Sequence, residues 1–542
     1  MEPRDLAGQV PALTTRDDKL QSLPTATDER PHSKPSAPRH NRIPAVYVFN
    51  PFAEGHMARG KSFTPVKHQA LLAGDLANLP QFLCRPHDVV LLAKRPSAAF
   101  LDTLTQAGFP PPEFVELTEG RINPAGSLCR RKIRRLRPWA WGPDSVELFE
   151  PLYARLAGEA RIASRHFNDN IARLYSKAWS ADFLSKALAR CHGRNEASPP
   201  AAEAPLRPDA AAAEPWLCSE EEAGVAVDSL EDALEAIAAI RGRGHPRVVV
   251  KEALGLAGHN AIRLWEPDVL PAQRQWLAHA LGHGRQLVVE PWLERVLDFS
   301  VQLEMGPRKL RLCGYTGLVN DRKGQFLANW AEADYRRRLP PKIVAFFRSA
   351  ADISRRLQRL YRDIFSLLEA ELQGARFVGP VSIDAFVYRS PQGGCRVKPV
   401  VEINPRYTMG RLTLELMKHA SPGTCGLFRL VTQAQARAEG FADLSAYARS
   451  LANRLPPRLS QDPAPVPDSA FACSAGVLAG EWTGRPAPCS PARSAEHPPR
   501  IRQGALCLND PGQAQVCLAT FEVSPALNLP PSLSRDESLP AA

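Results

Sequence analysis

The chain has 542 residues, more than one hydrophobic core can organise, so we expect two or three domains. Hydrophobic residues at 44% and charged residues at 23% are ordinary for a soluble globular protein, and no apolar run reaches the roughly 20 residues that span a bilayer. The net charge of +11 favours an anionic substrate or an acidic partner, although an arginine-rich solvated surface would carry the same charge.

The cysteines and the N-terminus indicate the expected compartment. The eleven cysteines are scattered singly and form no CxxC pair. This spacing argues against zinc sites and against a disulfide framework. The first residues lack the basic and then apolar pattern of a signal peptide. We therefore expect a cytoplasmic protein without membrane association.

Composition divides the chain into five parts. Residues 1–42 are polar and proline-rich, which predicts a disordered lead. A proline-rich tail closes the sequence, and within it residues 505–523 predict a β-hairpin. The expected parts are the lead at 1–42, an α/β domain at 43–160, a helical linker with an Ala/Pro-rich insertion at 161–245, the main domain at 246–450 and the tail at 451–542.

The first ordered part alternates strand and helix patterns. Strands are predicted at Ile43–Asn50, Asp88–Ala93 and Phe114–Leu117, and helices at Pro65–Leu79 and Pro96–Ala107. Strands that alternate with helices predict a small, mostly parallel sheet.

A basic run follows this part. Cys129–Arg137 carries six positive charges in nine residues. The run could bind phosphate, an acidic carrier protein or nucleic acid. The alternative is a solvated, basic helix face. No aromatic residues are interleaved with the charges, so nucleic-acid binding is not expected.

Two strand-like runs lie near the end of the main domain, after a long amphipathic helix predicted for Pro341–Leu372. Their alternation places Asp384 on one face of the first run, and Glu402 and Asn404 on one face of the second. If the runs form a hairpin, Asp384 lies opposite Glu402, with Asn404 one pleat further along. Directly opposed side chains are about 4.5–5.5 Å apart.

Two carboxylates at that distance repel, and one is driven towards protonation unless a cation lies between them. Mg²⁺ suits such a site because it takes carboxylate and amide oxygens together with nucleotide phosphates. The alternative is that Lys398, Arg406 or Arg411 neutralises the acids on an ordinary sheet face.

Asp384 and the segment Glu402-Ile-Asn404-Pro-Arg406 resemble the metal-binding end of ATP-grasp ligases, the superfamily that includes D-alanine–D-alanine ligase and biotin carboxylase. The resemblance implies an α/β (α+β) ATP-grasp fold after a small Rossmann-like domain. It implies that Asp384, Glu402 and Asn404 hold the metal. It further implies that Arg406, with Arg411, faces the acyl phosphate or the substrate.

Upstream residues follow the same family order, and the resemblance implies ATP-binding roles for them. Lys177, in a helical segment, resembles the first phosphate-binding lysine. The strand that ends at Lys251 and the loop with Gly255 and Gly258 resemble the lid over the phosphates. Glu290 matches the position beside the adenine amino group, and Asp298 matches the acid that binds the ribose hydroxyls. The alternatives are a tight hairpin closed by Lys251 and a surface acid at Glu290.

The function implied by the resemblance is ATP-dependent ligation. A carboxylate, such as that of an amino acid, would be activated as an acyl phosphate and joined to an amine or a thiol. The implied cofactors are ATP and Mg²⁺, with Mn²⁺ as a substitute, and an acyl carrier protein is a further candidate acceptor.

Two other functions remain open at this point. The chain could bind nucleotide without ligase turnover, or it could be a basic nucleic-acid-associated protein. One departure bears on the first of these. Some relatives place an arginine two residues before the metal-binding aspartate, where this chain has Ser382. Arg406 or Arg411 could supply that charge from the other strand.

Overall fold

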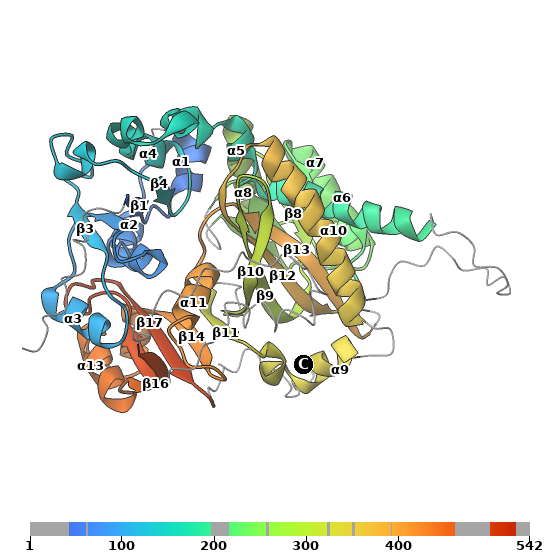
Figure 1. Cartoon of the computed structure of the whole chain (residues 1–542). Helices are drawn as coiled ribbons and strands as arrows, with labels where there is room; N and C mark the ends of the chain where they lie inside the picture. The colour runs from blue at the N-terminus through green and yellow to red at the C-terminus, as the bar shows by residue number, and fades with distance from the viewer. Residues whose placement is uncertain are drawn as a thin grey trace, which may run out of the picture. The chain divides into compact units, whose positions relative to one another are not determined.

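The computed structural model describes residues 43–60, 63–196, 216–255, 260–321, 326–348, 353–391, 393–460 and 499–526, which belong to one unit, Ile43–Ala542. The predicted disordered lead, most of the Ala/Pro-rich insertion, Gly258 and much of the tail lie outside these residues. Within them, every helix is too short or too polar to cross a membrane. The mixture of parallel and antiparallel sheets confirms the predicted α/β class (Figure 1).

The N-terminal part forms the predicted parallel sheet. Its strand order is β3-β2-β1-β4, and each neighbouring pair is parallel. The strands are β1 (Ala45–Val48), β2 (Val89–Leu92), β3 (Glu113–Glu116) and β4 (Arg135–Pro138). The helices are α1 (Ala53–Arg59), α2 (Lys67–Asp75), α3 (Ala98–Gln106) and α4 (Pro143–Leu148). β1 and β2 are buried along their whole length, as expected for parallel strands covered on both faces.

The basic run is not a helix face, so that interpretation was wrong. Its last residues form β4, which pairs with β1, and Leu136 is buried in the domain core. The charges are also paired separately. Arg131 contacts Glu113 at 2.7 Å, and Arg137 contacts Glu304 at 2.7 Å in a strand far along the sequence. The buried residues Ile133 and Leu136 lie three positions apart, a spacing typical of one helix face, and this spacing is why the pattern misled.

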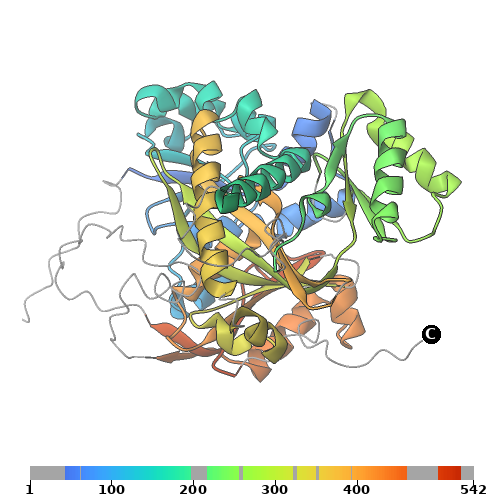
Figure 2. The same ribbon diagram turned by 90° about the vertical axis from the view of Figure 1, so that its right-hand side faces the viewer.

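A second, antiparallel sheet carries the predicted lid. Its order is β5-β8-β6-β7. The strands are β5 (Val225–Val227), β6 (Val248–Glu252), β7 (Ala261–Leu264) and β8 (Leu287–Pro291), and the helices are α7 (Leu230–Gly242) and α8 (Pro271–Leu281). Both helices pack their apolar residues on this sheet and lie side by side, as Figure 2 shows in green. The two predicted strands around Lys251 are confirmed as β6 and β7, and residues 256–259 of the loop between them lie outside the described residues.

Among the described residues, the largest sheet has nine strands in the order β13-β12-β9-β10-β11-β14-β17-β16-β15, all antiparallel. They are β9 (Glu294–Met305), β10 (Leu310–Asn320), β11 (Phe326–Glu332), β12 (Gly379–Arg389), β13 (Cys395–Asn404), β14 (Cys425–Thr432), β15 (Arg458–Ser460), β16 (Arg500–Cys507) and β17 (Cys517–Ser524). The hairpin predicted in the tail is confirmed as β16 and β17, which extend this sheet.

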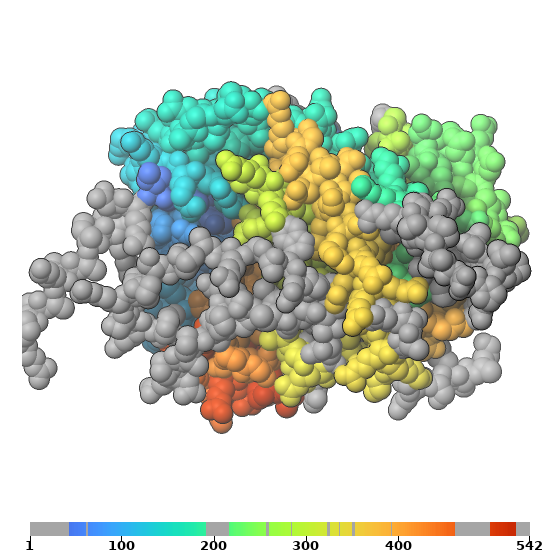
Figure 3. All heavy atoms as spheres, turned by 45° about the vertical axis from the view of Figure 1, so that its right-hand side comes forward, coloured from blue at the N-terminus to red at the C-terminus, as the bar shows by residue number. Residues whose placement is uncertain are grey.

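Helices cover both faces of the large sheet. α6 (Lys177–Glu196) and α10 (Ile353–Gly374) pack on β9, β12 and β13, and α11 (Met409–Met417) packs on the other face against β10 and β14. The apolar stripe of α10 points inward, and its opposite face lies at the surface in Figure 3. The remaining helices are α5 (Asp169–Arg173), α9 (Pro341–Arg348), α12 (Gln433–Ala438) and α13 (Leu444–Arg454). The structure has α9 and α10 where one helix was predicted, with residues 349–352 outside the described ranges.

Candidate functional site

The two carboxylates face each other across β12 and β13. Asp384 pairs directly with Glu402, and Ser382 pairs with Asn404, which is the predicted register. The Asn404 amide donates a hydrogen bond to Asp384 Oδ2 at 3.1 Å. A β-bulge follows, because the next pair joins Phe386 to Lys398. A bulge accommodates a residue that cannot donate a backbone hydrogen bond to the neighbouring strand, and Pro399 lies in this one.

The two carboxylates have different charge environments. Burial and the facing Glu402 raise the pKa of Asp384 to about 6, against the opposing effects of Ser300, Arg406 and Asn404. Burial would also raise the pKa of Glu402, but Lys177 and Arg406 outweigh it and hold that pKa below its ordinary value. Nearby cations therefore offset the negative charge of Glu402. The positive charge around Asp384 is too small to offset its burial and its repulsion from Glu402.

Lys177 links three elements at this point. It is the first residue of α6, as the resemblance implied. Its Nζ lies 3.1 Å from Glu402 Oε1 and donates to the Gly255 carbonyl at 2.9 Å. Its backbone N–H donates to the Ala253 carbonyl at 2.8 Å. The helix, the loop after β6 and the β13 strand thus meet at one ammonium group.

Lys251 lies in a second buried ion cluster. Glu290 Oε2 contacts Lys251 Nζ at 3.1 Å and Lys398 Nζ at 3.3 Å. Burial alone would raise the pKa of Glu290, but the two lysines lower it to about 2. Lys398 also donates to the Glu222 carbonyl at 2.8 Å and is 1% exposed. Sequence reasoning considered Lys398 only as a cation that could neutralise Asp384 and Glu402, and it missed the contact with Glu290. A single lysine within the apolar run Val397–Val401 was a signal of its burial.

The loop after β6 is close-packed at Gly255. A Cβ at this position would lie 2.7 Å from Asn260 Nδ2. The Asn260 amide in turn donates to Glu252 Oε2 at 3.0 Å. The absence of a Cβ at Gly255 therefore leaves room for the Asn260 side chain beside the residue whose carbonyl accepts from Lys177.

Asp298 lies near the start of β9 and pairs with Phe386 in β12. Its Oδ1 contacts Arg295 Nη1 at 3.0 Å. The Arg295 guanidinium lies 4.6 Å from the centre of the Phe386 ring and 5.8 Å from that of Trp292. Asp298 and its aromatic neighbours thus lie at the end of the sheet face that carries Asp384.

One face of β9 forms a polar row that sequence reasoning missed. Ser300 pairs with Asp384, and the Gln302 amide donates to Ser300 Oγ at 2.8 Å. Gln302 Oε1 accepts from Thr408 at 3.0 Å. Glu304 continues the row, since alternate residues share a face. The strict alternation of Asp298-Phe-Ser-Val-Gln-Leu-Glu304 was the available signal.

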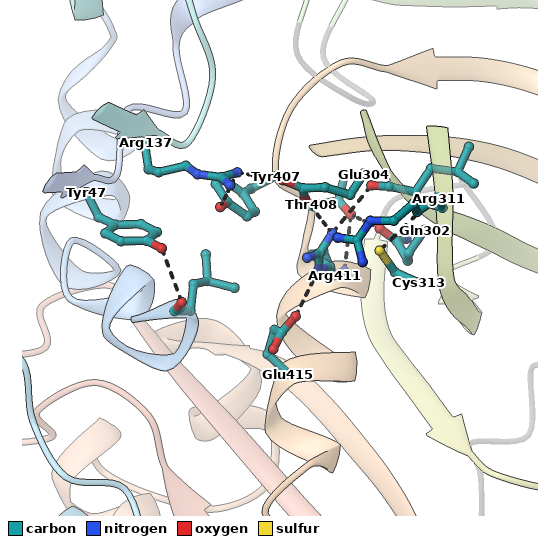
Figure 4. A network of polar contacts seen from close by, with 12 residues as sticks. Tyr47, Arg137, Gln302, Glu304, Arg311, Cys313, Tyr407, Thr408, Arg411 and Glu415 are labelled. Atoms are coloured by element: carbon teal, nitrogen blue, oxygen red, sulfur yellow. Dashed lines mark hydrogen bonds and ion pairs between the residues drawn. The ribbon is translucent and has the colours of Figure 1, made fainter. Parts of the chain in front are cut away.

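The two predicted arginines, Arg406 and Arg411, lie in different polar clusters. Arg406 lies on the carboxylate side, because its charge helps to lower the pKa of Glu402. Its Nε donates to Glu54 Oε1 of α1 at 2.8 Å, and Glu54 is buried. Arg411 instead contacts Glu304 and Glu415, each at 3.0 Å, in a second polar cluster (Figure 4). The structure therefore brings Arg406, but not Arg411, to Glu402.

A divalent cation at Asp384 would need ligands beyond the side chains. Within the described ranges, no group of three or more His, Cys, Asp or Glu residues could hold a metal ion. Two carboxylates and an amide oxygen are a partial set for Mg²⁺, which usually keeps water and nucleotide phosphates as its other ligands.

No protein-family model matches the sequence, and no curated protein matches it. Solved structures similar to this chain include N5-carboxyaminoimidazole synthetase from Staphylococcus aureus complexed with ADP, at 11% identity over 73% of this chain and 84% of that chain, with a TM-score of 0.37. A biotin carboxylase–β,γ-ATP complex from Campylobacter jejuni has 13% identity over 72% and 76%, with a TM-score of 0.37. An L-amino acid ligase from Bacillus licheniformis has 11% identity over 72% and 80%, with a TM-score of 0.34.

Proposed function

We propose that the chain is an ATP-grasp ligase that uses ATP to activate a carboxylate and joins it to an amine or a thiol. The observation that carries the proposal is the direct opposition of Asp384 and Glu402, with Asn404 hydrogen-bonded to Asp384 and Lys177 paired to Glu402. A structural ion pair would need one acid for one cation. Here a second acid, Asp384, lies directly opposite Glu402, and its pKa is raised to about 6.

The donor set fits Mg²⁺. Asp384, Glu402 and the Asn404 side-chain oxygen would hold the ion, and its charge would stabilise the deprotonated form of Asp384. When bound, Mg²⁺ supplies positive charge that offsets the phosphate charges of ATP. An amide adds an oxygen ligand without adding a third negative charge.

The chain's own cations would position the phosphates. Each ammonium group has three donors, so Lys177 and Lys251 could contact phosphate oxygens while they retain a carboxylate partner. Glu290 would hold Lys251 in place, and backbone groups next to it in β8 would meet the adenine edge. Asp298 would accept the ribose hydroxyls, because a carboxylate offers two acceptor oxygens and no donor.

Arg406 would neutralise charge at the reacting carboxylate. A substrate carboxylate oxygen attacks the γ-phosphorus of ATP, ADP leaves, and an acyl phosphate forms. An amine or thiol then attacks the acyl carbon, and phosphate leaves with formation of an amide or a thioester. Arg406 is held by Glu54 of the N-terminal domain, so its orientation depends on both domains.

A substrate screen tests the proposal. ADP release would be followed with amino acids and small acids, each combined with amines and with carrier-protein thiols. The proposal predicts release that requires Mg²⁺, a carboxylate and an acceptor, and the acceptor that works decides between amide and thioester formation. ATP binding without ADP release from any pair would instead indicate a nucleotide-binding protein without turnover.

A further inference from the structure

A polar cavity of about 170 Å³ lies between the N-terminal sheet and the far end of the β9 polar row. On the same measure one water needs about 15 Å³, so the cavity can take a charged group of several atoms. It is lined by Tyr47, Leu83, Arg85, Arg134, Arg137, Glu304, Tyr407, Arg411 and Glu415. Figure 4 shows Tyr47 and Arg137 on one side, with Arg411 and Glu415 on the other.

The lining carries surplus positive charge, with four arginines and two glutamates. Glu304 is shared, since its Oε1 lies 2.7 Å from Arg137 Nη1 and its Oε2 lies 3.0 Å from Arg411 Nη1. Glu415 is shared between Arg411 and Lys418, at 3.0 and 2.6 Å. The acids therefore orient the arginines without cancelling their charge.

Donor groups remain available in the cavity. Among the described residues, both side-chain hydrogen bonds of Arg137 use Nη1, to Glu304 and to the Tyr407 hydroxyl. Those of Arg411 use Nε and Nη1. A guanidinium has five N–H donors in a planar fork that matches the oxygens of carboxylates and phosphates. Arg85 and Arg134 are exposed at the edge of the cavity, and Arg134 Nη2 also contacts Oδ1 of the buried Asp88 at 3.4 Å.

The cavity is connected to the carboxylate pair along β9. Glu304 lies four residues from Ser300, the partner of Asp384, which is about 13 Å along a strand. Gln302 lies between them and binds Thr408, three residues before Arg411. Ser300 and Gln302 are buried, so packed side chains rather than an open channel join the cavity to Asp384.

We propose that this cavity binds a small dianion, either a phosphate group or a pair of carboxylates on one molecule. Singly charged amino acids would leave the arginine surplus unmatched. The basic run contributes through Arg134 and Arg137, and these two residues bind a small anion rather than a protein surface.

The test compares two double variants of the full chain. R85Q/R134Q removes two charges at the cavity, and R121Q/R130Q removes two charges from exposed arginines of the same domain that do not line it. The probes are inorganic phosphate, succinate and acetate, followed by calorimetric titration. We expect phosphate or succinate to bind the wild type and R121Q/R130Q alike, and R85Q/R134Q about tenfold more weakly or worse.

Tighter binding of phosphate would indicate a phosphate ligand, and tighter binding of succinate would indicate a dicarboxylate. Acetate carries a single charge and should bind most weakly. Equal affinity of phosphate and succinate for both double variants, or no binding to the wild type, would overturn the inference. ATP titration and ADP release are measured in parallel. Dianion binding that depends on Arg85 and Arg134 without ADP release from any substrate would refute the ligase and retain the anion site. ADP release by the wild type, together with phosphate and succinate binding that R85Q/R134Q leaves unchanged, would retain the ligase and refute the site.

Discussion

Replacing Asp384 by Asn should stabilise the metal-free protein while it removes the metal site. The pKa of Asp384 rises from 3.8 to about 6 through burial and the facing Glu402. Two units correspond to about 3 kcal/mol. Because Asp384 is only half-buried, solvent screening reduces this, and we expect about 1–2 kcal/mol. Since the folded pKa lies above the unfolded value, wild-type stability falls as pH rises from about 4 to about 6.

Urea unfolding of the wild type and D384N, with and without Mg²⁺, measures the effect. Without Mg²⁺ at pH 7, D384N should be more stable, and the difference should shrink towards pH 4. Mg²⁺ with a non-hydrolysable ATP analogue should stabilise the wild type but not D384N. E522Q is the matched control, since burial also raises the pKa of Glu522, in β17, and its Mg²⁺ response should stay normal. A D384N protein that is less stable at pH 7, or that responds to Mg²⁺ like the wild type, would refute the reasoning.

Three further outcomes are expected. K251A should raise the KM for ATP and slow turnover, and K251R should rescue poorly because a planar fork does not replace a compact ammonium; an unchanged ATP titration would show that Lys251 only holds Glu290. K398M should destabilise the protein by about 3 kcal/mol in urea, because it breaks a buried ion pair and strips a donor from the Glu222 carbonyl; a loss below about 1 kcal/mol would contradict this. Mg²⁺ affinity in calorimetric titrations should fall about tenfold per pH unit below about 6, as Asp384 takes up a proton, and a flat profile would exclude Asp384 as a ligand.

Local periodicity was enough to predict the carboxylate hairpin. Alternation in β12 and β13 is strict near Asp384, and a hairpin with one buried face tolerates no slip of one residue. Alternation placed Asp384 and Glu402 on the same face, and the expected opposition of the two is observed. The bulge at Pro399 lies between the turn and that pair, because Arg389 pairs with Cys395 and Phe386 with Lys398 on the turn side. An uninterrupted ladder would have placed Asp384 opposite Val400, so the bulge is what brings Glu402 to that position.

Contacts between distant segments could not be read in the same way. Glu54 reaches Arg406 across 352 residues, and Arg137 reaches Glu304 across 167. Each of these arginines lies in a different local sequence pattern. Neither pattern indicates which acid the arginine contacts in the fold. Arg411 was grouped with Arg406 because the two are close in sequence. The start of α11 between them turns Arg411 towards Glu304 instead.

The most direct test of the proposed function is Mg²⁺-dependent ADP release by the wild type and by E402Q, with E147Q as a control at an exposed glutamate. Glu402 lies opposite Asp384 and is paired with Lys177, so its loss should weaken Mg²⁺ binding far more than it weakens the sheet. We predict that E402Q folds normally and releases no ADP above background, whereas E147Q turns over like the wild type. ADP release by folded E402Q at the wild-type rate would contradict the assignment of the site.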